Sequence, residues 1–368
     1  MIEITYVFTR DRSKKLLENK FESLDFFYGS QYFINKGGYN LNIVEFDDNK
    51  PSKYFFYYFD RFFQKFLSLP FYTNKINSYK NLKIFLNSDK IIFVNESTAC
   101  SSIFLLLISK LVFKKVETHM FVMGLYSKKL KYPLLRFFHN LIIKFLCLFI
   151  DKIYFLGLGE LNNAKKIHNN NLTKLISFPF HIDTAFWSNN SQVQANNILF
   201  VGNDGNRDPE KFISAVKDLK NEKFVAVSNL DNFKNINVDN FTLYSNETSG
   251  RKLTDTELKK IYSDSKLVVI PLKESYQPSG QSVALQAMSM GIPVLITETK
   301  GFWDPNNFKD NKNIFFANKN SNEEFTKKII ELISDKELLE AVALRGKETV
   351  KKNLSIERLN KEIEKFIV

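Results

Sequence analysis

Short, uninterrupted apolar runs recur along the chain, and longer segments with helical spacing separate them. The runs cover residues 2–8, 41–46, 90–95, 116–119 and 153–156 in the first half, and 197–202, 224–227, 266–272 and 292–297 in the second. Apolar runs without polar alternation are typical of parallel strands that are buried on both faces. Strands that alternate with helices predict an α/β fold with a parallel sheet in each half.

Helical spacing fills most of the intervals between these runs. It predicts helices over residues 21–36, 53–69, 101–113, 134–150, 209–219, 258–263, 279–291, 323–333, 337–353 and 355–366. Pro209 stands at a first helical position, and Thr254 with Glu257 has the spacing of a capping box. The polar, Asn-rich residues 189–197 predict an interdomain linker.

The clearest strand–loop–helix unit covers residues 266–297. A polar loop follows its first strand, and Ser279-Gly280 then turns the chain into a helix that Gly291 and Pro293 end. The first turn of such a helix presents amide groups and the positive end of the helix dipole, which together form an anion site, most often for phosphate. Many α/β proteins carry the same unit without a ligand, so the residues alone leave both readings open.

Residues 53–69 are unusually aromatic. They include nine Phe and Tyr residues, from Tyr54 to Phe66, on a predicted helix. Aromatic stripes are usually core, so we expect this helix to be buried. A membrane-binding or acceptor-binding surface is the alternative.

The net charge of the chain lies entirely in its first half. The formal charge is +12; residues 1–180 carry 26 basic and 14 acidic side chains, and the remainder carries 26 of each. This asymmetry predicts two domains with different partners. The length of 368 residues suits about two domains.

Residues 110–152 concentrate the basic side chains beside long apolar runs. They carry nine basic residues and two acidic ones, and Arg136, His139 and Lys144 interrupt the apolar stretch, which is too short to span a bilayer. We interpret this segment as a contact with an anionic membrane surface. A core helix with snorkelling lysines is the alternative. Nucleic acid is not expected, since no binding motif is present.

Cysteine and histidine patterns predict neither disulfides nor a metal site. Cys100 and Cys147 are the two cysteines, and four scattered histidines show no ligand spacing. We expect a cytoplasmic protein, peripheral at the inner face of the cytoplasmic membrane. The first eight residues read as a strand rather than as a signal peptide.

Three segments occur together in the second half: a hinge over residues 178–184, a strand over residues 198–202, and the stretch ending in Ala287-Met288, Gly291 and Pro293-Val294. On these residues, the second half resembles the GT-B glycosyltransferases, in particular the retaining group known as family 4, or glycosyl transferases group 1. Residues 178–184 resemble the proline–x–glycine–x–aspartate crossover of that group, with His181 in place of glycine. Residues 198–202 resemble the strand that starts its donor domain, and the stretch ending in Ala287-Met288, Gly291 and Pro293-Val294 resembles its signature helix. The resemblance covers roughly residues 177–320, and over 1–176 it is only topological.

This resemblance implies two Rossmann-like domains that face a cleft. It places an acceptor-binding domain at 1–182, a nucleotide-sugar-binding domain at 183–353, and a C-terminal helix at 354–368 that returns to the first domain. It implies that Gly202, Ser279, Gly280, Gln281 and Ser282 contact the donor. Arg207 falls where the group has its phosphate lysine. Asn203 falls where the group has arginine, so Lys252 or Lys273 is expected to supply the second positive charge.

Two further positions depart from the group. The group carries two glutamates eight residues apart, and here these positions are Pro278 and Gln286. Gln286 can still bind the ribose hydroxyls. Glu274, on the same loop, is the available substitute for the first glutamate, and some members of the group have a serine–glycine–glutamine loop instead. His119, at a predicted strand end, is expected to contact the donor sugar or the acceptor hydroxyl.

The resemblance implies a retaining glycosyltransferase that needs no metal or other cofactor. It would use a UDP- or GDP-sugar and a saccharide or lipid-linked acceptor, in the synthesis of a bacterial cell-envelope polysaccharide or glycolipid. A nucleotide-sugar epimerase of the same fold is one alternative. A non-catalytic partner subunit is the other, because the glutamate pair is missing.

Overall fold

The structure of the chain is a computed structural model that describes residues 1–18, 21–49, 53–112, 116–168, 173–189, 195–248, 250–318 and 321–368. The chain divides into two compact units. The first comprises Met1–Phe21, Phe26–Pro179 and Asn360–Val368, and the second comprises Glu22–Asp25 and Phe180–Leu359. Phe113, Lys114, Lys115 and residues 190–194 of the predicted linker lie outside the described residues. The domain boundaries at 182 and 353 stay predictions.

The first unit contains a six-stranded parallel sheet in the order β2-β1-β3-β4-β5-β6. Its strands are β1 (Ile2–Phe8), β2 (Tyr39–Glu45), β3 (Lys90–Phe93), β4 (Glu117–Val122), β5 (Lys152–Phe155) and β6 (Leu175–Ser177). β6 was not predicted from the sequence. Strand order reverses between β1 and β3, so the carboxyl ends of these two strands form the switch point of the sheet.

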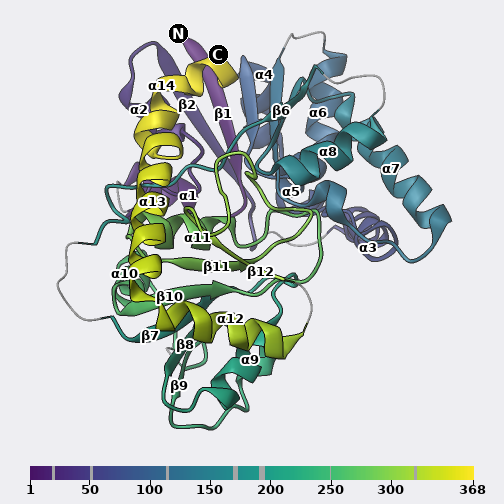
Figure 1. Cartoon of the computed structure of the whole chain (residues 1–368). Helices are drawn as coiled ribbons and strands as arrows, with labels where there is room; N and C mark the ends of the chain where they lie inside the picture. The colour runs from purple at the N-terminus through teal and green to yellow at the C-terminus, as the bar shows by residue number, and fades with distance from the viewer. Residues whose placement is uncertain are drawn as a thin grey trace. The chain divides into compact units, whose positions relative to one another are not determined.

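Both faces of this sheet are buried. Val7, Ile91 and Met120 belong to the core on one face, and Tyr6, Ile92 and Phe121 alternate with them and are likewise buried. This explains why the strands lack polar alternation. Figure 1 shows α2 and α14 on one side of the sheet and α6 and α8 on the other.

The helices of the first unit are α1 (Arg12–Leu17), α2 (Ser30–Asn35), α3 (Tyr54–Leu67), α4 (Tyr79–Asn87), α5 (Glu96–Ser101), α6 (Ile103–Leu111), α7 (Pro133–Cys147) and α8 (Leu158–Ile167). They differ from the prediction in several segments, since α1, α4, α5 and α8 were not predicted and one predicted helix is partly wrong. The helix predicted over 21–36 is wrong for residues 21–29. Phe26, Tyr28 and Gly29 have positive φ angles there, because the chain turns after Glu22–Asp25 joins the second unit.

The aromatic helix α3 is mostly exposed, so the expectation of a buried stripe is wrong for six of its aromatic residues. Phe59 and Phe63 pack against the core, whereas the exposed members are Tyr54, Phe55, Tyr57, Tyr58, Phe62 and Phe66. A 14-residue helix with aromatic residues all round can turn only one side toward the sheet.

The second unit also contains a six-stranded parallel sheet, in the order β12-β11-β10-β7-β8-β9. Its strands are β7 (Asn197–Val201), β8 (Lys223–Val227), β9 (Phe241–Tyr244), β10 (Ser265–Ile270), β11 (Val294–Thr297) and β12 (Phe315–Ala317). The predicted α/β fold with two parallel sheets is confirmed. The order reverses between β7 and β10, where open α/β sheets bind their ligands.

The helices of the second unit begin and end close to the predicted positions. They are α9 (Pro209–Asp218), α10 (Asp255–Ser263), α11 (Gln281–Ser289), α12 (Asn322–Ser334), α13 (Lys336–Asn353) and α14 (Ile356–Ile367), whose last residues belong to the first unit. The capping box is confirmed, since Glu257 N donates to Thr254 Oγ1 and Thr254 N donates to Glu257 Oε2. Within the described part of the chain, no helix has the length and hydrophobicity needed to cross a membrane.

Candidate functional site

Two loops meet at the switch point of the second sheet. Residues 202–208 follow β7, and residues 271–280 follow β10. The amide of Lys273 donates to Asn206 O at 2.8 Å, and the amide of Asp208 donates to Pro271 O at 3.0 Å. The Asn206 side-chain amide also donates to Gln277 Oε1 and Ser279 Oγ, each at 2.9 Å. These bonds hold the two loops as one structure at the carboxyl edge of the sheet.

Arg207 lies beneath these loops with an incompletely paired guanidinium. Its side chain is 4% exposed, and Nε and Nη1 have no hydrogen-bond partner among the described residues. The nearest carboxylate oxygen, Asp204 Oδ2, lies 3.5 Å from Nε. Burial lowers the pKa of Arg207, so the fold holds a cation at a position that is unfavourable for charge. A buried cation with unused donors is suited to receive an anion.

Two glycines let the guanidinium reach this position. A Cβ on Gly202 would stand 2.0 Å from Arg207 Nε, and a Cβ on Gly280 would stand 2.9 Å from Arg207 Nη1. Both glycines also have positive φ angles, +154° and +79°. The Arg207 side chain therefore fills space that any other residue at 202 or 280 would occupy.

The helix α11 begins at the same place. Gly280 is its N-cap, and the amides of its first turn, from Gln281 onward, have no acceptor within the helix. Amide donors, the positive end of the helix dipole and Arg207 thus converge on one point. The structure brings together the predicted residues Gly202, Arg207, Ser279, Gly280, Gln281 and Ser282.

The remaining predicted residues lie around this point in different ways. Asn203 Oδ1 accepts the amide of Asn229 at 2.5 Å, which ties the β7 loop to the β8 loop. Lys273 is exposed, and its backbone is bonded to Asn206. Glu274 Oε1 accepts the amide of Lys300 at 2.9 Å. Lys252 is exposed in the loop before α10, and no described contact links it to Arg207.

Gln286 points into the protein. Its amide nitrogen donates to Asp25 Oδ2 at 2.8 Å, and its oxygen accepts the Tyr262 hydroxyl at 3.3 Å. Trp187 Nε1 donates to the same Asp25 oxygen at 2.7 Å, and the Asp183 amide donates to Asp25 Oδ1 at 2.7 Å. In this geometry the side-chain amide of Gln286 has a structural role, since both of its ends bond within the protein. Its predicted contact with a ribose stays a prediction.

The network around Asp25 was missed in the sequence. Asp25 comes from a segment of four residues that the sequence pattern assigned to a helix of the first half. The one signal in the sequence is the side-chain amide of Gln286, which needs hydrogen-bond partners when it is buried. In the fold, Asp25 joins α11 to the crossover segment that carries Asp183 and Trp187.

Asp25 is expected to make the second unit less stable as the pH rises from about 4 to about 6. Burial raises its pKa from the ordinary 3.8 to about 6 against the opposing effect of its hydrogen bonds, so the folded form favours the protonated acid. That stabilisation is complete below pH 4, is lost by about pH 6, and amounts to about 3 kcal/mol. Urea unfolding of wild type and Asp25→Asn across this range measures it. Parallel stability curves for the two proteins would refute the assignment.

His119 lies elsewhere than predicted. It is the third residue of β4, pairs with the first residue of β5, and is fully buried, so the expectation of a position at the carboxyl end of the strand is wrong. The apolar run simply continues for three residues beyond it. Its Nδ1 lies 3.0 Å from the Tyr154 hydroxyl, and burial lowers the pKa of His119. This surrounding favours a packing role over contact with a substrate.

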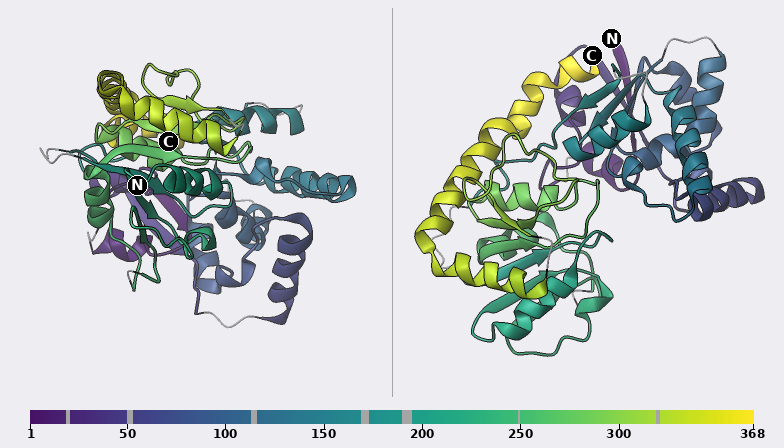
Figure 2. Two further views of the ribbon diagram at one scale, coloured as in Figure 1. Left: turned by 60° about the horizontal axis from the view of Figure 1, so that its bottom comes forward. Right: turned by 45° about the vertical axis from the view of Figure 1, so that its right-hand side comes forward.

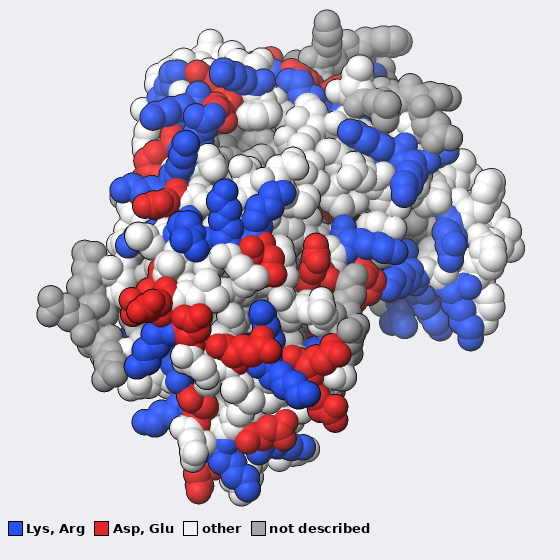
Figure 3. All heavy atoms as spheres, in the orientation of Figure 1, with Lys and Arg blue, Asp and Glu red and all other residues white. Residues whose placement is uncertain are grey.

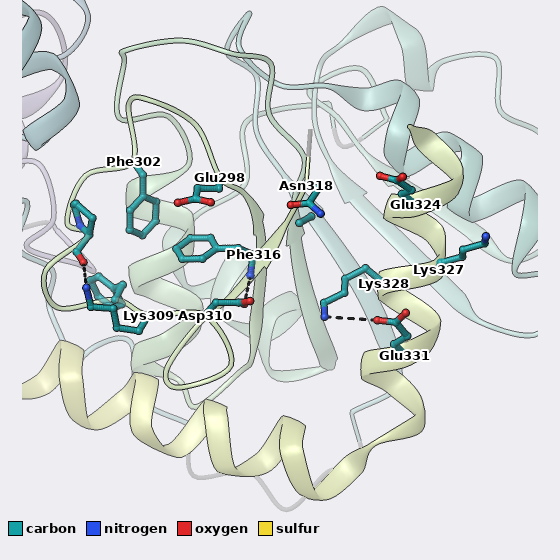
Figure 4. A pocket seen from close by; sticks show the side chains of 13 residues that line it. Glu298, Phe302, Lys309, Asp310, Phe316, Asn318, Glu324, Lys327, Lys328 and Glu331 are labelled. Atoms are coloured by element: carbon teal, nitrogen blue, oxygen red, sulfur yellow. Dashed lines mark hydrogen bonds and ion pairs between the residues drawn. The ribbon is translucent and has the colours of Figure 1, made fainter. Parts of the chain in front are cut away.

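Two of the cavities formed by the described residues are lined mainly by polar side chains. One of about 640 Å³ lies between the loop after β11 and helix α12 (Figure 4). Its walls mix Glu298, Asp310 and Glu331 with lysines, and Lys328 pairs with Glu331 at 3.6 Å. Its carboxylates make it a poor site for a diphosphate.

The other cavity, of about 370 Å³, lies in the first unit at the carboxyl ends of β3 and β4. Asn95, Glu96, Gln64, Tyr72 and Lys128 are among its lining residues. The Glu96 carboxylate accepts the amide of Met123 at 3.1 Å. This polar pocket adjoins the switch point of the first sheet, where a ligand is expected.

Comparisons with known proteins agree with the geometry of the second unit. Residues 195–335 match the family model described as glycosyl transferases group 1. No curated protein matches the chain in sequence. The structure is similar to that of Anabaena HepE in complex with UDP-glucose, with a TM-score of 0.69, 10% identity, and coverage of 100% of this chain and 99% of that one.

Two other solved structures share the fold at similar levels. A glycosyltransferase from Rickettsia africae has a TM-score of 0.65 and 11% identity, with 99% of this chain and 97% of that one covered. Sucrose-phosphate synthase from Thermosynechococcus elongatus has a TM-score of 0.64 and 11% identity, with 100% and 98% covered. At such low identity these likenesses show the fold, which is that of the GT-B glycosyltransferases.

Proposed function

We propose that this chain, which has the GT-B fold and a second unit that matches glycosyl transferases group 1, transfers a sugar from a nucleotide sugar to an acceptor. The proposal rests on one observation above all. The guanidinium of Arg207 is buried, has two donor nitrogens without a hydrogen-bond partner among the described residues, and lies against Gly202, which follows β7, and Gly280, the N-cap of α11. This arrangement fits the diphosphate of the donor.

Negative charge develops on the leaving nucleotide as the bond between sugar and phosphate breaks. Arg207 and the first-turn amides of α11 would stabilise that charge, which is worth most in a site that excludes water. Lys273 and Lys252 are the candidates for a second cation, and Glu274 is the candidate for a contact with the donor sugar. We propose transfer with retention of configuration and without a metal ion, as the resemblance to the retaining group implies.

A uridine nucleotide is the favoured donor, since similar structures were solved with UDP and with UDP-glucose. The acceptor is proposed to be a saccharide or a lipid-linked saccharide of the cell envelope. Its head group would enter the pocket of about 370 Å³ in the first unit, where amide, carboxylate and ammonium groups can bind hydroxyls.

Melting of the chain in the presence of UDP, GDP, ADP and CMP sugars tests the donor site. A ligand at a hundredfold excess over its Kd is expected to raise the melting temperature by about 5–10 °C. The ligand that does so is then incubated with lipid-linked acceptors in buffer containing EDTA, and transferred sugar is measured. Conversion of the free donor to its epimer would indicate an epimerase. If no nucleotide sugar binds, the enzyme proposal is wrong, and the alternative of a non-catalytic partner subunit is favoured.

A further inference from the structure

Exposed apolar side chains concentrate on two helices of the first unit. On α3, the residues Tyr54, Tyr58, Phe62 and Phe66 recur every fourth position and therefore lie on one face. Their exposed fractions run from 85% at Tyr54 to 46% at Phe66. Folding alone does not explain why aromatic residues occupy this solvent-facing side.

The helix α7 has a similar face. Leu134, Phe137, Leu141, Phe145 and Leu148, at the end of the helix, follow one another at intervals of three or four residues. Their side chains are 45–74% exposed, whereas Ile143 and Leu146 on the opposite side are buried in the core. The core thus uses one side of α7 and leaves a second apolar side in water.

The two helices adjoin each other. α3 contacts α7, and His139 Nδ1 of α7 lies 2.6 Å from the carbonyl oxygen of Leu67 at the end of α3. Figure 2 shows both helices projecting from the same side of the first unit. We name their exposed residues together the α3–α7 face. In the described part of the second unit, Val238, Tyr244, Ile330 and Leu344 are the comparably exposed large apolar side chains.

The charge around this face is almost entirely positive. Arg61, Lys65, Arg136 and Lys144 are exposed on the two helices, and Lys131 is exposed just before α7. The one carboxylate on the two helices, Asp60, is buried and accepts hydrogen bonds from Thr73. Figure 3 shows Lys and Arg side chains gathered on this side of the molecule with few acidic ones between them.

Three kinds of partner could cover an apolar, basic surface. A second copy of the chain would bring like charges together, which disfavours it. Nucleic acid would use the cations and aromatic residues, but Leu134, Leu141 and Leu148 offer nothing that stacks on bases. An anionic bilayer uses all three features, because aromatic residues suit the headgroup level, leucines enter the acyl boundary and lysines contact the phosphates.

We propose that the α3–α7 face docks this protein on an anionic membrane surface. The polar pocket of the first unit adjoins the same elements, because Gln64 of α3 and Lys128 before α7 help to line it. Docking therefore places the pocket beside the bilayer, where a lipid-linked saccharide could enter with its chain still in the membrane. The docking itself is independent of the proposed donor site; only this identification of the acceptor rests on the proposed function.

Co-sedimentation with vesicles tests the docking. The full chain is expected to bind vesicles of phosphatidylcholine with phosphatidylglycerol, to bind phosphatidylcholine alone much more weakly, and to be released by salt. The double variant Phe62→Ser/Phe137→Ser should bind at least about tenfold more weakly. The matched control Ile330→Ser/Leu344→Ser removes apolar side chains of similar exposure from the second unit and should bind like wild type.

A second pair of variants separates charge from apolar contact. Lys65→Gln/Lys144→Gln should weaken binding about tenfold or more, and the control Lys217→Gln/Lys220→Gln should not. All eight positions are partly or fully exposed, and melting temperatures will show that each variant folds. Equal binding by all variants would overturn the proposal. So would a dimer that Phe62→Ser/Phe137→Ser dissociates, or tight binding of single-stranded RNA without binding of vesicles.

The proposal and the proposed function fail separately. Arg207→Met should bind vesicles like wild type, because Arg207 belongs to the second unit. If the chain transfers sugar to a water-soluble acceptor but does not bind vesicles, the docking proposal is wrong and the proposed function stands. If the chain binds vesicles but no nucleotide sugar, the proposed donor site is wrong and the docking proposal stands.

Discussion

Replacing Arg207 with methionine is expected to lower the kcat/KM for sugar transfer by about 10²–10³ and to leave the free protein at least as stable as wild type. Most arginine substitutions that remove activity also remove stabilising contacts. Here Nε and Nη1 have no hydrogen-bond partner among the described residues, and the side chain is 4% exposed. The free protein therefore carries the desolvation cost of a buried charge without its full compensation.

Methionine is chosen because it keeps most of the volume between Gly202 and Gly280 while it removes the charge. Thermal melting without ligand should show an equal or higher melting temperature, and the stabilisation by a nucleotide sugar should disappear. Lys217→Met removes an exposed cation from the neighbouring helix and should change neither quantity. A variant that melts much lower than wild type, yet still binds the donor, would contradict the role assigned to Arg207.

Replacing Gly202 with alanine is expected to lower the free energy of unfolding by about 2–4 kcal/mol and to abolish donor binding. The three atoms nearest to the new Cβ would all belong to Arg207, with Nε at 2.0 Å, and φ is +154°. The arginine must therefore leave its position. Gly205→Ala is the matched control in the same loop, because its Cβ would meet no atom within 4 Å.

A double variant shows whether the damage comes from this single clash. If Arg207 is the obstacle, Gly202→Ala/Arg207→Ala should be more stable than Gly202→Ala alone, since the clash is gone and only backbone strain remains. Chemical denaturation of the four proteins gives the coupling energy. Additive losses would mean that Gly202 is needed for a reason other than room for the guanidinium.

The two sheets could be predicted from the sequence because most of their central strands are buried on both faces, whereas β6, β9 and β12 were not predicted. Runs such as Leu267–Ile270, with no polar break, have few alternatives to a parallel strand. Both ends of α11 could also be predicted, because Ser279-Gly280 precedes the segment with helical spacing and Gly291 follows it. Residues that are close together in the sequence determine these strands and helix ends, so a single sequence is enough to predict them.

Features that depend on contacts between distant parts of the chain could not be predicted from the sequence. Asp25 lies 261 residues from the Gln286 amide that it accepts, and no local pattern links them. The local pattern predicts a strand end at His119, because only the pairing with β3 and β5 shows that Met120, Phe121 and Val122 continue β4. The aromatic stripe on α3 predicts a buried helix, but hydrophobicity alone does not tell which side of a helix faces the sheet.

The crystal structure of the chain with UDP tests the central claim most directly. The β-phosphate is predicted to lie within hydrogen-bonding distance of Arg207 and of the first-turn amides of α11. A diphosphate bound anywhere else, for example in the cavity of about 640 Å³ beside α12, would contradict the account.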